Sequence, residues 1–188
     1  MGKLVISKSL VERVAQSLHD RNDSSSSKLF PTDPNATVLA EAEKQAFEVL
    51  KRDQSGLLTF FLVYTLPLAG ESKSVGLFLS EVILDAFRLA GWTVRRIDAV
   101  EFVSALQANR ELKKKVATAH SKFADQYLWN ERLKGQPDLL RYIVKVLCGK
   151  HHTCLHDLPP DNLGPLLMVL KSIVDVLNKD SEVNLEVN

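Results

Sequence analysis

Several features that would define a class of protein are scarce in this sequence. Two cysteines in 188 residues exclude a small scaffold held together by disulfides. No apolar run approaches the ~18 residues of a membrane span, so we expect no membrane segment. The 24 basic and 23 acidic residues leave a net charge of +1, which removes the global charge argument for binding nucleic acid. The first apolar stretch, at 4–6, is too short for the core of a signal peptide, so we expect a cytoplasmic protein.

The composition that remains, 45% apolar and 25% charged, is typical of a globular domain with one sizeable core. Apolar residues at helical spacing occur before residue 20, and a serine-rich stretch with two prolines follows. We expect an N-terminal helical arm at 1–20, a flexible Ser/Pro-rich linker at 21–37, a single globular domain at 38–180 and a frayed tail at 181–188. The alternative for the arm is that its helix packs onto the globular domain.

The middle of the chain predicts the fold class. Residues 57–65 form a short, continuously apolar run that is rich in β-formers, which favours a buried strand. Residues 75–90 repeat apolar positions at helical spacing and stop at Gly91, and 92–97 then predicts a second strand. We therefore expect an α+β fold that is predominantly α-helical, with one βαβ element packed with a helical bundle. The alternative is an all-α fold in which the first apolar run is a buried helix.

A polar loop at 67–74 follows the first expected strand, where phosphate-binding loops occur. Pro67 and Ser72 stand where the Gly-x-x-x-x-Gly-Lys-Ser/Thr pattern has its glycines, so that motif is incomplete. The alternative is an ordinary polar loop that begins a helix. A small-ligand or cofactor site here would use Gly70, Glu71, Lys73 and Ser74.

The same stretch resembles the opening βαβ unit of cobalamin-binding Rossmann-type domains. The residues that carry the resemblance are Gly70-Glu71, Val75-Gly76-Leu77 and Ala90-Gly91-Trp92-x-Val94. It implies a Rossmann-like beginning and a bound cofactor. The sequence departs from that family where Lys73 replaces the usual histidine and where no Asp-x-His-x-x-Gly loop occurs.

A second candidate site is the dense group of metal-binding residue types at 148–156. Zinc favours cysteine and histidine ligands, so this loop predicts a zinc site. The spacing is not that of paired Cys-x-x-Cys knuckles, and a polar loop between helices is the alternative. The candidate ligands are Cys148, His151, His152, Cys154 and His156.

No complete catalytic motif occurs, so we expect a non-enzymatic intracellular protein-interaction or regulatory domain without a required cofactor. The helices expected at 138–148 and 163–177 are strongly apolar, and they belong either to the core or to an interface with a protein partner or a second copy. Basic clusters at 95–96 and 113–115 are interrupted by acidic residues. An ordinary solvated helix surface explains them better than nucleic-acid binding does.

Overall fold

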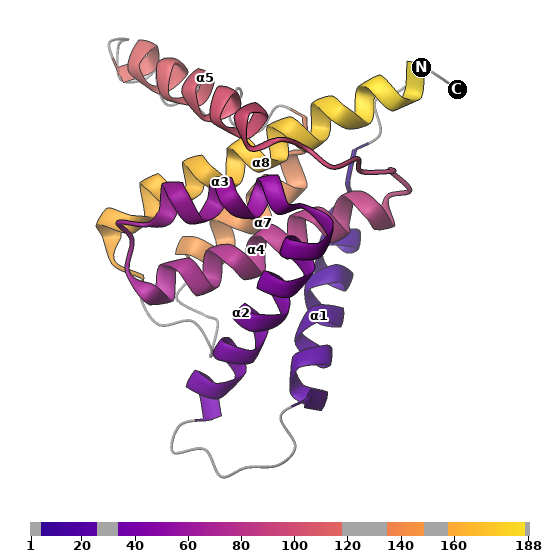
Figure 1. Cartoon of the computed structure of the whole chain (residues 1–188), viewed down its shortest axis with the longest axis vertical. Helices are drawn as coiled ribbons and strands as arrows, with labels where there is room; N and C mark the ends of the chain where they lie inside the picture. The colour runs from indigo at the N-terminus through magenta and orange to yellow at the C-terminus, as the bar shows by residue number, and fades with distance from the viewer. Residues whose placement is uncertain (1–4, 26–33, 118–134, 149–157, 187–188) are drawn as a thin grey trace.

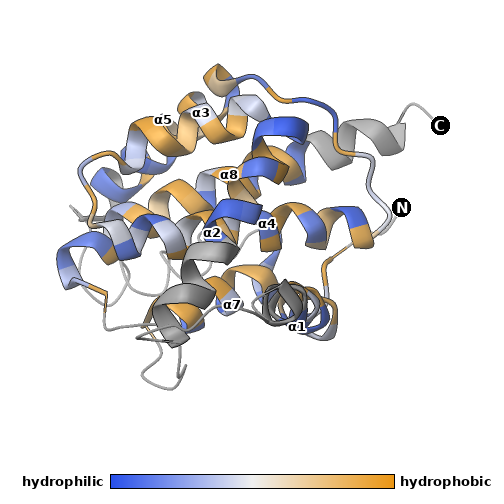
Figure 2. Cartoon of the chain, turned by 60° about the horizontal axis from the view of Figure 1, so that its bottom comes forward, coloured by the Kyte–Doolittle hydropathy of each residue, from blue (hydrophilic) through white to orange (hydrophobic). Residues whose placement is uncertain are grey.

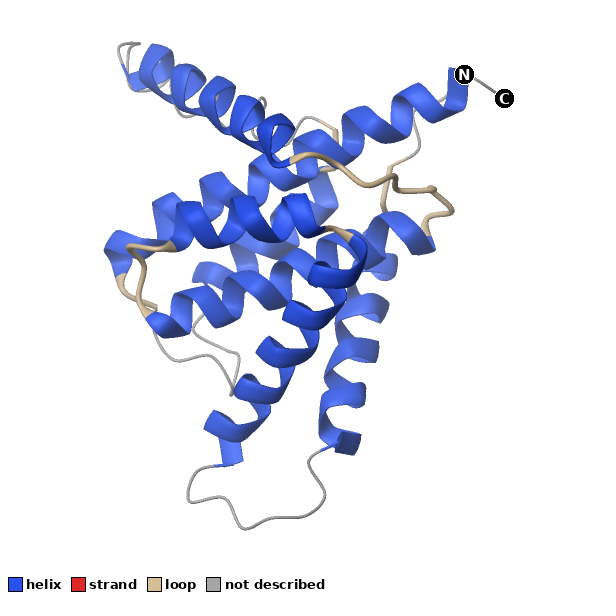
Figure 3. Cartoon of the chain, in the orientation of Figure 1, coloured by secondary structure: helices blue, strands red, loops and turns tan. Residues whose placement is uncertain are grey.

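The computed structural model describes residues 5–25, 34–117, 135–148 and 158–186, and side chains within these ranges except at residues 19, 21–25, 34–42, 115–117 and 180–186. All regular structure in these ranges is helical, as Figure 3 shows. The helices are α1 (Lys8–Ser25), α2 (Pro34–Asp53), α3 (Ser55–Thr65), α4 (Gly70–Leu89), α5 (Ala99–Ala117), α7 (Pro137–Cys148) and α8 (Pro160–Glu186).

Helices α4 and α8 form the centre of the molecule and pack against each other. In α8, the residues between Leu166 and Leu177 are buried almost all round the helix, which is the pattern of a helix enclosed by others. α1 and α2 lie side by side against α4, whereas α3, α5 and α7 pack on α8 (Figure 1). The core is therefore two apolar helices wrapped by five amphipathic or peripheral ones within the described ranges.

The prediction of a βαβ element is wrong, and the all-α alternative is the one that fits. Residues 57–65 belong to α3, where the buried positions recur at helical spacing rather than on alternate residues. A helix satisfies its own backbone hydrogen bonds, whereas a strand needs a neighbour. Among the described residues no strand lies beside this run, so the local apolar composition did not decide the structure.

Residues 92–97 form an extended connection rather than a strand. The buried side chain of Gln54 supplies hydrogen bonds that a neighbouring strand would otherwise make. Its Nε2 donates to the carbonyl of Arg95 at 2.6 Å, and its Oε1 accepts from the amide of Ile97 at 3.2 Å. Gly56 allows the same segment to approach, because a Cβ at that position would collide with the carbonyl of Ile97.

The end of α4 follows the sequence prediction. Gly91 has a φ of +89°, a conformation that favours glycine. Its amide donates to the carbonyl of Arg88 at 3.0 Å, and the amide of Trp92 donates to that of Phe87 at 3.1 Å. These two bonds make a Schellman cap, at which the helix ends. The centres of the Phe87 and Trp92 rings lie 4.6 Å apart, which is the apolar contact that accompanies such a cap.

The two strongly apolar helices are core elements. Leu139, Leu140 and Ile143 of α7 are buried, as are Leu170 and Ile173 of α8. Their apolar faces are thus covered by the chain itself, and little apolar surface on these two helices is left for a partner to bury. Among the described residues, no helix is both long enough and apolar enough to cross a membrane.

Candidate functional site

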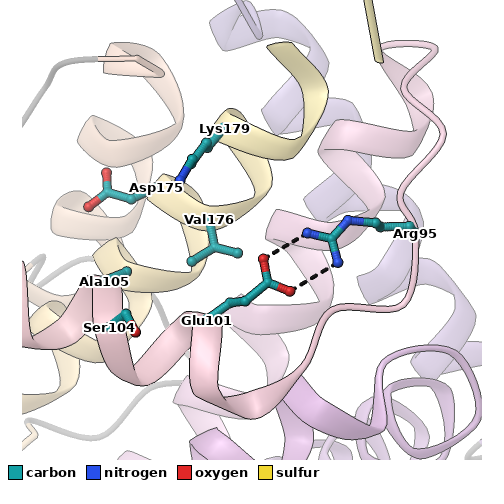
Figure 4. A pocket seen from close by; sticks show the side chains of 7 residues that line it. All are labelled: Arg95, Glu101, Ser104, Ala105, Asp175, Val176 and Lys179. Atoms are coloured by element: carbon teal, nitrogen blue, oxygen red, sulfur yellow. Dashed lines mark hydrogen bonds and ion pairs between the residues drawn. The ribbon is translucent and has the colours of Figure 1, made fainter. Parts of the chain in front are cut away.

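The described residues line a half-open pocket of about 520 Å³ between α5, α8 and the connection that precedes α5. Figure 4 shows its walls: Arg95 reaches in from the connection, α5 lies opposite α8, and an apolar floor lies between charged side chains. This volume is within the range of about 300–1,000 Å³ that is usual for small-molecule sites. The lining residues are Arg95, Glu101, Ser104, Ala105, Asp175, Val176 and Lys179.

One wall of the pocket is an ion pair between Arg95 and Glu101. The Nη1 and Nη2 atoms of Arg95 donate to Oε1 and Oε2 of Glu101 at 3.0 and 2.7 Å. The hydrogen bonds from Arg95 hold the pKa of Glu101 below its ordinary value, so this carboxylate stays ionised. The bridge ties the connection to the first turn of α5 and keeps that side of the pocket in place.

The opposite wall is held by a partly buried polar network between α5 and α8. Asp175 Oδ2 accepts from Lys171 Nζ at 2.6 Å and from Asn109 Nδ2 at 2.8 Å. The same Asn109 Nδ2 lies 3.2 Å from Ser172 Oγ. Both donors bind Oδ2, and Figure 4 shows this carboxylate pointing away from Glu101 and Arg95.

Lys179 is a further charged residue of the pocket lining. It lies one helical turn beyond Asp175 on α8, on the same side of the helix. Its ammonium group has no ion pair within 4 Å among the described residues, although its charge lowers the pKa of Glu101 as a minor contribution. Ala105 and Val176 provide the apolar surface of the pocket.

A second surface feature is the outward side of α3. This helix contains no charged residue, and Figure 2 shows orange turns along it. Leu62, Val63 and Leu66 are 43%, 59% and 73% exposed, and their spacing places them along one side of the helix. We call these three residues the α3 strip. Apolar side chains gathered in this way are typical of a binding surface.

A basic residue of α5, Arg110, adjoins one end of the α3 strip. The guanidinium carbon of Arg110 lies 5.5 Å from the centre of the Tyr64 ring in the last turn of α3. Lys113 comes eleven residues after Phe102, which stacks on Phe60 of α3, so it lies on the side of α5 that faces α3. Neither Arg110 nor Lys113 forms an ion pair with a described residue.

The two basic clusters do not make one surface. Residues 95–96 precede α5 and 113–115 lie near its end, about 25 Å away along the helix. Arg95 is bound to Glu101, and Arg96 Nη2 donates to the carbonyl of Arg52 at 2.8 Å.

Comparison with protein families, curated proteins and solved structures finds no match.

Of the loop predicted at 67–74, only 67–69 connects α3 to α4, and 70–74 form the first turns of α4. The strand that a phosphate or cofactor loop follows is missing from the part of the chain described here. Gly70 and Glu71 are exposed in the first turn of α4, and Lys73 is half-buried. Ser74 Oγ donates to Glu43 Oε2 at 2.5 Å, which ties α4 to α2. These residues are brought together on one helical turn but form no enclosed site among the described residues. A ligand site here stays a prediction.

Most of the proposed zinc site lies outside the described residues, which include only Cys148, an exposed free thiol at the end of α7. Within the described ranges, no group of three metal-binding side chains comes together. Zinc binding by His151, His152, Cys154 and His156 stays a prediction.

Sequence reasoning did not find the pocket. Its residues come from three segments that are far apart in the chain, and only the packing of α5 on α8 brings them together. One signal was present: charged residues recur every four residues within and just after the strongly apolar stretch 163–177, at Lys171, Asp175 and Lys179. Charges in such a helix must find partners or line a cavity.

Proposed function

We propose that this chain is a non-enzymatic cytoplasmic interaction domain that binds an amphipathic helical segment of a partner protein along the α3 strip. The observation that carries the proposal is an uncharged surface helix whose three outward apolar side chains remain uncovered by the described residues. A helix that is apolar on all sides is normally enclosed, so exposure on one side favours an external partner.

The charges beside the strip indicate the partner's composition. Arg110 lies over the Tyr64 ring near the end of α3 at which Leu66 is exposed, and Lys113 follows three residues later on α5. Neither forms an ion pair with a described residue. An apolar stripe with glutamate or aspartate at one end would therefore complement this surface. A second copy of the chain is the weaker candidate, because a stable dimer buries about 800 Å² per subunit and three side chains offer less.

The test uses two labelled helical peptides with the same leucine stripe, one carrying glutamates beside it and one carrying lysines. We expect the glutamate peptide to bind more tightly in a fluorescence-polarisation titration. Leu66→Asp should weaken its binding by at least about tenfold, because it buries an unpaired charge in the interface. Leu89→Asp is the matched control, since Leu89 is 64% exposed at the far end of α4.

Two results would contradict the proposal. The first is equal binding of both peptides, or of neither. The second is a sedimentation coefficient that rises over a hundredfold increase in concentration and loses this dependence in Leu66→Asp, because the α3 strip would then bind a second copy.

A further inference from the structure

The pocket between α5 and α8 carries one positive charge that its two ion pairs do not neutralise. Arg95 and Glu101 pair at 2.7 Å. Lys171 and Asp175 pair at 2.6 Å, so each carboxylate already has a basic partner. Lys179 also lines the pocket, and it forms no ion pair with any described residue. Among the described residues, the pocket and its supporting network therefore hold three cations against two carboxylates.

The polar contacts around the pocket hold its walls in place. The pair of Arg95 and Glu101 joins the connection to the first turn of α5. Asp175 of α8 accepts a hydrogen bond from Asn109 of α5, which joins the two helices. Because these contacts exist before a ligand arrives, less conformational freedom is lost on binding. The side chain of Lys179 is exposed at the open side of the pocket, so a ligand can reach its ammonium group.

We infer that this pocket binds a small monocarboxylate with a compact aliphatic body, whose carboxylate contacts the ammonium group of Lys179 and whose body lies against Ala105 and Val176. This site is separate from the α3 strip and does not depend on the proposed function.

The balance of charge favours a ligand with a single negative charge. One carboxylate neutralises the excess positive charge of Lys179 and leaves both existing ion pairs intact. A phosphate dianion would bring a second negative charge, for which the described lining has no unpaired cation left, and it would face the carboxylate of Glu101. An amine would meet the ammonium group of Lys179 and would find both carboxylates already paired.

The apolar floor of the pocket indicates the body of the ligand. Val176 is largely buried and Ala105 is half-buried, and both lie between the charged side chains. A short branched aliphatic chain would cover this surface and remove it from water. The pocket volume of about 520 Å³ accommodates such a molecule with ordered water beside it. A carboxylate alone, without an aliphatic body, would leave the floor exposed.

The experiment compares three probes on the full chain by amide NMR titration: isocaproate, isocaproamide, which has the same shape without the charge, and inorganic phosphate. We expect isocaproate to shift the amide signals of Ala105 and Val176 in a saturable manner. Isocaproamide should bind at least about threefold more weakly, because it keeps the apolar contact and loses the ion pair. Phosphate should also bind more weakly, because it has no aliphatic body. The affinity for isocaproate should fall as salt is added.

Two variants should change the affinity for isocaproate in opposite directions. Lys179→Gln, on an exposed side chain, should weaken isocaproate at least about threefold and leave isocaproamide unchanged. Glu101→Gln removes the carboxylate that neutralises Arg95, so isocaproate should bind more tightly. Lys145→Gln, at an exposed position on α7, is the matched control for Lys179→Gln and should change nothing. The amide spectrum of each variant verifies that its fold is intact.

Three outcomes would overturn the inference. Equal binding of isocaproate and isocaproamide would mean an apolar site in which the charge has no part. Phosphate that binds as tightly as isocaproate would mean a general anion site without use of the apolar floor. No saturable shift with isocaproate, or the same affinity in Lys179→Gln as in the unchanged chain, would show that Lys179 holds no carboxylate in this pocket.

Discussion

At the scale of single residues, two buried glutamines hold together segments that are distant in the sequence. Gln54 binds the backbone of the connection at Arg95 and Ile97. Gln136 accepts from the amide of Ile6 at 2.7 Å and donates to Asn178 Oδ1 at 2.8 Å. A side-chain amide both donates and accepts, so it pairs with backbone groups for which no secondary-structure neighbour exists.

Replacing Gln54 by leucine keeps the side-chain volume but removes both bonds. The amide of Ile97 is then buried without a partner, so we expect Gln54→Leu to lower the free energy of unfolding by about 2 kcal/mol. Urea denaturation followed by circular dichroism measures this. Gln107→Leu, on an exposed position of α5, should stay within about 0.5 kcal/mol of the unchanged chain. Equal stability of the two variants would show that the Gln54 bonds contribute nothing net.

At the scale of helices, close packing at Gly76 sets how α4 meets its neighbours. Gly76 is buried, and a Cβ there would lie 2.7 Å from Leu166 Cδ1 and 2.7 Å from Phe61 Cζ. These atoms belong to α8 and α3, so the missing side chain lets three helices approach each other. Gly164 is also helical, but nothing lies within 4 Å of the place a Cβ would occupy.

The same substitution should therefore differ in its effect at the two glycines. Alanine is the better helix former, but at Gly164 its Cβ would crowd the Cδ of Pro165, the next residue in the helix, so we expect Gly164→Ala to change the free energy of unfolding by less than about 0.5 kcal/mol. Gly76→Ala gains the same preference but forces Phe61 and Leu166 to move, so we expect a net loss of about 1–2 kcal/mol. Thermal or urea unfolding of both variants tests this, and a stabilised Gly76→Ala would mean that the three helices have room to adjust.

At the scale of the whole molecule, α1 is packed as part of the core. Val11, Val14 and Leu18 are buried against the other helices, and α1 contacts α2, α4 and α7. The backbone before it is tied to Gln136, and the amide of Lys8 donates to Asp138 Oδ2 at 3.2 Å. The extended form of a detachable arm would expose these apolar side chains to water.

Truncating a side chain of α1 should therefore destabilise the whole domain. We expect Val14→Ala to lower the free energy of unfolding by about 2 kcal/mol, through lost burial and the cavity left behind. Val5→Ala is the control, because Val5 is 47% exposed, and should cost less than about 0.5 kcal/mol. Urea unfolding should show one transition by both circular dichroism and tryptophan fluorescence. An unchanged midpoint for Val14→Ala would indicate an arm that unfolds independently.

The sequence by itself determined much of the local structure. The helices at 75–90, 138–148 and 163–177, and the stop at Gly91, are found where apolar spacing and a glycine predict them. These features depend on neighbours within one or two turns, so they can be read from a short stretch of chain.

Only the tertiary structure decided whether 57–65 was a strand or a helix, because an apolar run of that length suits both until its neighbours are known. It also decided which apolar faces stay uncovered: α7 and α8 are enclosed, whereas the α3 strip is not. The pocket depends in the same way on the packing of α5 against α8, which places Glu101 opposite Lys179. Contacts between residues so far apart in the chain are set by how the whole core packs, and no local pattern encodes them.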